Sequence, residues 1–75
     1  MAELPVVSAR QAVHAFERAG WGVKRRHSSH IILTKAGSWA SLSVPDYGEL
    51  DRALLRKLIR QAGLSVEEFV ELLKA

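Results

Sequence analysis

A segment with two histidines, His27–His30, directly follows three consecutive cationic residues, Lys24–Arg26. Cationic side chains bind phosphate groups, and an imidazole can give or take a proton near neutral pH. RNA carries its own nucleophile, the 2′-hydroxyl, so a protein that cleaves RNA does not have to supply one. The segment is therefore a candidate site for RNA cleavage. The alternative is that both histidines are ordinary surface residues beside basic neighbours.

Other kinds of catalytic or metal site find little support in the sequence. The chain has no cysteine, and no carboxylate lies near His27 and His30 to complete a set of metal ligands. It has neither a phosphate-binding loop of the G-x-x-x-x-G-K type nor a nucleophile elbow, and Asp46 and Glu49 are not spaced as a catalytic pair. We expect neither a metal ion nor a small-molecule cofactor.

Positive charge is concentrated in the first part of the chain. Residues 1–60 carry ten Lys or Arg against five acidic residues, and residues 21–35 carry four Lys or Arg and no acidic residue. Such a segment favours a polyanionic partner, and nucleic acid is the commonest one in a cell. Arg52, Arg56 and Arg60 recur every four residues, and we interpret them as a solvated side of a helix; an extension of the phosphate-binding surface is the alternative.

Length and composition are those of one folded domain, which we expect to span residues 1–75. Hydrophobic residues make up 48% of the chain and charged residues 25%, the balance of a globular protein. The apolar runs are far shorter than the roughly 20 residues that span a bilayer. Residues 1–5 show no signal peptide, so we expect a cytoplasmic protein.

Periodicity predicts six elements in the order α-β-β-β-α-α. A helix is expected from Ala9 to Ala19, with Ser8 as N-cap and Gly20 at its end. Strands are expected over 21–26, 30–35 and 39–44. An apolar stripe over 54–62 predicts a second helix that Gly63 closes, and Ser65 with Glu68 forms a capping box for a last helix.

These elements predict an α+β two-layer sandwich, with a three-stranded antiparallel sheet and helices on one of its faces. Ser28-Ser29 suits a two-residue turn poorly, so we expect a bulge or a longer loop there. Trp39 is interpreted as packing across the strands, with base stacking as the alternative. Alternation directs Trp21, Val23, Ile31, Leu33, Ala40, Leu42 and Val44 toward the helices, and Lys24, Arg26, His30, Ile32, Thr34, Trp39, Ser41 and Ser43 away from them.

Several stretches resemble those of one known family. They are Leu4 to Val13, Ala19-Gly20-Trp21, Ser29-His30, Ser43-Val44-Pro45, and Leu54 to Ser65 with Glu68-Phe69. In order and spacing this chain is similar to the HicA family, the small messenger-RNA-cleaving toxins of bacterial toxin–antitoxin pairs. The resemblance implies a fold like the double-stranded-RNA-binding domain. It also implies a single catalytic histidine in a Gly-Ser-His motif.

That histidine corresponds to His30 in this sequence. Two residues differ from the family pattern: Ser28 stands in place of the usual glycine, and Tyr47 stands where many members have histidine or another polar residue. The resemblance thus implies a toxin that acts as a metal-independent endoribonuclease on mRNA, with a HicB-like antitoxin as its protein partner. The residues expected to bind RNA are Lys24, Arg25, Arg26, His27, Ser29 and Lys35.

Two other interpretations of the sequence remain open. The same fold could serve as an RNA-binding module without catalysis, in which His30 is only a surface residue. A protein that interacts with another chain through its open sheet face is the third possibility.

Overall fold

Ser8 starts the first helix, because its side chain and that of Gln11 each accept a hydrogen bond from the other's backbone N–H. The helix that follows, α1 (Ala9–Arg18), ends at Ala19, and Gly20 then takes a φ of +101°. The structure is a computed structural model that describes residues 3–75, so residues 1–2 of the predicted domain lie outside the described part. Within residues 3–75 no helix has the length and apolar character needed to cross a bilayer.

Three antiparallel strands follow α1 and pair in sequence order. They are β1 (Gly22–His27), β2 (His30–Thr34) and β3 (Leu42–Pro45), with β2 in the centre. Pro45 is the last residue of β3, as expected of a residue that cannot donate to a ladder. The third strand is shorter than the predicted 39–44, because residues 35–41 form a loop instead of pairing.

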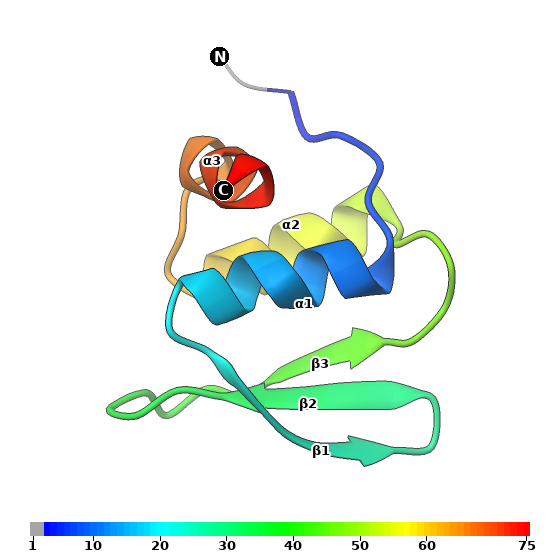
Figure 1. The fold of residues 1–75 in the computed structure, drawn as a ribbon, viewed down its shortest axis with the longest axis vertical. Helices are drawn as coiled ribbons and strands as arrows, with labels where there is room; N and C mark the ends of the chain where they lie inside the picture. The colour runs from blue at the N-terminus through cyan, green and yellow to red at the C-terminus, as the bar shows by residue number, and fades with distance from the viewer. Residues whose placement is uncertain (1–2) are drawn as a thin grey trace.

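Two helices complete the chain. Asp51 caps α2 (Arg52–Gln61) by accepting a hydrogen bond from the N–H of Leu54, and the predicted Ser65–Glu68 capping box starts α3 (Val66–Lys74). Figure 1 shows α1 and α2 over one face of the sheet, while α3 packs on these two helices rather than on the strands. The predicted order of elements and the open sheet face are confirmed. A simple two-layer arrangement places every helix directly on the sheet, whereas, among the described elements, α3 contacts only the other two helices.

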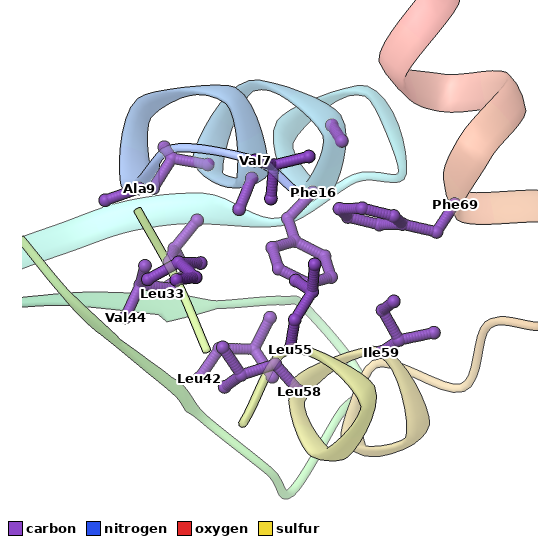
Figure 2. Close-up of a cluster of buried hydrophobic side chains, with 14 of the residues drawn as sticks. Val7, Ala9, Phe16, Leu33, Leu42, Val44, Leu55, Leu58, Ile59 and Phe69 are labelled. Carbon is purple, nitrogen blue, oxygen red and sulfur yellow. The ribbon is translucent and has the colours of Figure 1, made fainter. Parts of the chain in front are cut away.

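The buried side chains form one cluster between the sheet and the helices. Figure 2 shows Leu33, Leu42 and Val44 of the sheet facing Phe16 of α1 and the apolar side of α2. Phe69 joins α3 to this cluster through an aromatic contact with Phe16, with ring centroids 5.2 Å apart and planes tilted by 47°. The same cluster fixes which face of the sheet stays open, because it holds Ile31 and Leu33 of the central strand on the helix side.

Two of the predicted core-facing residues are not buried. Val23 is on the helix face, opposite Leu33, but it is 44% exposed because β1 is an edge strand. Ala40 lies in the loop and only partly packs against the core. Trp39 was expected to pack across strands, and this prediction was wrong: its side chain is fully exposed.

Candidate functional site

The turn between β1 and β2 brings the two histidines of the segment together. It is a two-residue turn, Ser28-Ser29, and His27 pairs with His30 across it. The sequence predicted a bulge or a longer loop at this turn, and this prediction was wrong: Ser28 accepts a φ of +56°, in the left-handed region that normally favours glycine, and the register shift lies at Val23–Arg25 instead. Directly opposed residues have Cβ atoms about 5 Å apart and share one sheet face, so both imidazoles project from the same side.

A β-bulge in β1 decides which cationic side chains join the histidines. Before the bulge Val23 pairs with Leu33, and after it Arg25 pairs with Ile32 and Arg26 with Ile31, so Lys24 is the extra residue. Arg25 therefore lies on the open face with His27 and His30. Arg26 was predicted on that face too, and this prediction was wrong. The extra residue shifts Arg26 to the side of the buried Ile31, toward the helices.

Asp46, the first residue after β3, holds the turn from two sides. Its backbone N–H donates to the carbonyl of Ser29 at 2.6 Å, and its carboxylate accepts from Nη1 of Arg26 at 2.8 Å. The contact links β1, the turn and the end of β3, and it fixes the backbone just before His30. The sequence offered no signal for this role, because Asp46 and Arg26 are twenty residues apart and belong to no motif.

His30 is the half-buried member of the site, whereas Arg25, His27, Ser28 and Ser29 are exposed. Its backbone is held in the centre of the sheet, opposite His27 on one side and Pro45 on the other. Among the described residues no group forms a hydrogen bond with its imidazole, so the ring nitrogens remain free for a ligand on the open face. A positioned imidazole beside an arginine can exchange a proton with a bound phosphodiester while the guanidinium neutralises its charge.

The other predicted RNA-binding residues are spread over the sheet rather than gathered at His30. Lys24 is exposed at the bulge. Lys35 lies beyond the opposite end of β2, where its side chain crosses Gly20: a Cβ placed on Gly20 would be 3.2 Å from Cε of Lys35. The site around the turn thus contains Arg25, His27, Ser29 and His30. Lys35 lies apart from this site, with its side chain against Gly20 at the end of α1.

Remaining charged groups lie outside this site. His14 is exposed on α1 and lines a shallow groove with Arg10, Glu17 and Arg26. The arginines of α2 are exposed on a helix that covers the other face of the sheet. Within residues 3–75, no three His, Cys, Asp or Glu side chains lie close enough together to hold a metal ion.

Fold and site together define a class of protein. A three-stranded antiparallel sheet with helices in the order α-β-β-β-α-α is a small α+β fold, consistent with that of double-stranded-RNA-binding domains. Its open face carries the histidine pair, and its strands lie within an acid-free stretch, residues 18–45.

Comparison with known proteins identifies the family. Residues 9–64 match the family model described as the HicA toxin of bacterial toxin–antitoxin systems. The match runs from the first residue of α1 to just beyond α2 and covers most of the chain, so the protein belongs to the HicA toxin family. None of the curated proteins matches the chain. The predicted resemblance is confirmed, and α3 lies beyond the matched residues.

Proposed function

We propose that this toxin is a metal-independent endoribonuclease that cleaves mRNA with His30 as its catalytic residue. The observation that carries the proposal is the position of His30 in a HicA-family chain. It is half-buried on the open sheet face, diagonally across the ladder from Arg25, and belongs to a stretch without acidic residues. A HicB-like antitoxin that covers this cationic face is the protein partner that the family membership supports.

The reaction needs only groups that the chain and the RNA supply. The 2′-hydroxyl loses its proton and attacks the adjacent phosphorus, the bond from phosphorus to the 5′-oxygen breaks, and that oxygen takes up a proton. His30 is placed to carry one of these two protons. Arg25, with Lys24 beside it, offsets the negative charge that develops on the phosphate oxygens. The products are a 2′,3′-cyclic phosphate, which the addition of water opens to a 3′-phosphate, and a 5′-hydroxyl.

Cleavage of a long single-stranded RNA in EDTA tests this proposal, with the wild type compared with His30→Ala and His14→Ala. His14 is the matched control, because it is an exposed histidine on α1 that lies outside the site. We expect His30→Ala to lose about 10²–10⁴-fold in rate, the usual contribution of general acid–base catalysis, and His14→Ala to keep most of the activity. Products that end in 3′-hydroxyl groups, or equal cleavage by His30→Ala, would contradict the proposal.

A further inference from the structure

Trp39 is the most exposed large apolar side chain in the described part of the chain. It is fully exposed, whereas the other tryptophan, Trp21, is only 3% exposed and belongs to the core. A fully exposed indole contributes no burial to the stability of the fold. Its ring is therefore available for a contact with another molecule.

The loop that carries Trp39 has a defined shape. The N–H of Ser38 donates to the carbonyl of Lys35 at 3.0 Å, and Gly37 takes a φ of +82° between them, which closes a tight turn. The N–H of Ala40 donates to Oγ of Ser38 at 3.3 Å, across Trp39 itself. Ala40 packs partly against the core, so the loop is anchored directly after the indole. These contacts hold the backbone on both sides of Trp39 while its ring projects into solvent.

The surroundings of Trp39 indicate what it binds. No acidic residue occurs from Arg18 to Pro45, the stretch that contains all three strands and this loop, and Lys24 and Arg25 are exposed on β1 within it. A cationic, acid-free surface with an exposed aromatic ring is the combination with which proteins bind single-stranded nucleic acid. The charges attract the phosphates, and the ring stacks on a base regardless of its identity.

The position of the loop relative to His30 indicates which nucleotide of a bound RNA Trp39 can reach. Figure 1 shows the β2–β3 loop projecting from one end of the sheet, with the β1–β2 turn at the other end. The five residues of β2 separate them, which corresponds to about 15 Å of extended chain. A base stacked on Trp39 therefore belongs to a nucleotide outside the scissile pair.

We propose that Trp39 forms a second, sequence-tolerant subsite that stacks an unpaired base of the same RNA strand that His30 cleaves. This inference rests on the proposed ribonuclease function for the identity of the strand. It adds a preference for single-stranded over duplex RNA, because the bases of a duplex are already stacked and cannot receive the indole.

Binding to a single-stranded RNA of about 12 nucleotides tests the subsite, since single-stranded sites span about 4–16 nucleotides. Trp39→Ala, Trp39→Leu and Trp39→Phe are compared, each in the His30→Ala background so that the RNA stays intact. Loss of one stacked base costs about five- to a hundredfold in affinity. We expect that loss for Trp39→Ala and Trp39→Leu, and less than about a threefold change for Trp39→Phe, which keeps an aromatic face. Because Trp39 is fully exposed, none of these variants should unfold the protein.

Tryptophan fluorescence gives an independent readout. The RNA should quench the emission of the His30→Ala protein, and this quenching should disappear in Trp39→Phe, where the buried Trp21 is the remaining fluorophore. Unchanged affinity in Trp39→Ala, or absence of RNA binding, would overturn the subsite, and the indole would then be a contact for a protein partner. If the wild type cleaves RNA while Trp39→Ala binds normally, the subsite alone fails. If binding depends on Trp39 but the wild type does not cut, the ribonuclease proposal alone fails.

Discussion

Ser28 occupies the least favourable backbone position of the site. A residue with a side chain in the left-handed region costs about 1 kcal/mol or more, and Ser28 has a φ of +56°. Glycine removes this cost but adds conformational freedom to the unfolded chain. We expect Ser28→Gly to raise the free energy of unfolding by about 0.5–1 kcal/mol and Tm by about 2–8 °C, measured by thermal and denaturant unfolding.

Ser29 provides the control for this change within the same turn. Its φ is not positive, so Ser29→Gly brings no relief of strain and should lower the free energy of unfolding by about 0.5–1 kcal/mol. Equal effects of the two substitutions would show that the left-handed conformation of Ser28 is not a source of strain.

Asp46 places a negative charge at the turn that carries His30. The side chains of Arg26 and Asp46 are 64% and 39% exposed, so their ion pair adds at most about 1 kcal/mol to stability. Asp46→Asn keeps the backbone N–H that binds Ser29 and removes this negative charge. We expect little change in Tm and stronger RNA binding in the His30→Ala background, with an unchanged salt slope because Arg26 lies on the helix side of the sheet.

Glu71→Gln is the matched control for Asp46→Asn. It makes the same change in net charge and removes the ion pair with Lys74 on α3, away from the turn. The interpretation of Asp46 predicts that this variant strengthens RNA binding less than Asp46→Asn does. Equal gains in affinity from both variants would mean that net charge, rather than the position of Asp46 at the turn, controls binding.

At the scale of elements, the most buried contact of α3 is aromatic, beside the partial packing of Val66, Leu72 and Leu73 and a hydrogen bond from Arg18 to the carbonyl of Leu72. Phe69 is the only fully buried residue of α3, and its ring packs on Phe16 of α1. Phe69→Ala leaves a cavity beside Phe16, and we expect it to lower the free energy of unfolding by about 3–5 kcal/mol, a large part of the stability of a small domain. Phe69→Leu refills much of the space and should cost less than half as much. Urea unfolding compares the two; similar losses would show that α3 is not attached through this ring.

The helices could be predicted from the sequence because each has a local signal. Ser8, the Ser65–Glu68 capping box and the closing glycines marked helix ends that the structure confirms to within one residue for α1. The strands were predicted in the right order, yet the side chains of β1 were misplaced beyond Lys24. Lys24, Arg25 and Arg26 are all charged, so their alternation carries no sign of the bulge that moves Arg26 to the helix side.

The β2–β3 loop and the contacts of Asp46 at the turn could not be predicted from the sequence, for a different reason. Trp39, Ala40 and Ser41 alternate like a strand, but the turn at Lys35–Ser38 keeps their backbone out of the ladder. Asp46 reaches Arg26 and Ser29 only because the sheet brings the end of β3 beside the turn. His30 itself was located by the family pattern, and its placement next to Arg25 needed the register of the folded sheet.

At the scale of the whole molecule, two groups of exposed cations, one on β1 and one on α2, lie in different parts of the fold. Lys24 and Arg25 lie in β1, within the acid-free stretch, whereas Arg56 and Arg60 are exposed on α2, which covers the opposite face of the sheet. The net charge of +3 does not distinguish these two groups of cations. The proposed function does distinguish them, because it predicts that the phosphates of an RNA strand bound at His30 lie over the open face and meet Lys24 and Arg25.

The salt dependence of RNA binding tests which of these two groups of cations contacts the phosphates. Each phosphate contact with single-stranded RNA contributes about 0.7 to the slope of log K against log salt concentration. In the His30→Ala background we expect Lys24→Gln with Arg25→Gln to reduce the slope by about 1.4. Arg56→Gln with Arg60→Gln removes the same charge from α2 and should leave the slope unchanged, with only a small loss of affinity from the weaker long-range field. If the α2 pair reduces the slope and the sheet pair does not, RNA follows the helix, and His30 cannot be the residue that meets the scissile phosphate.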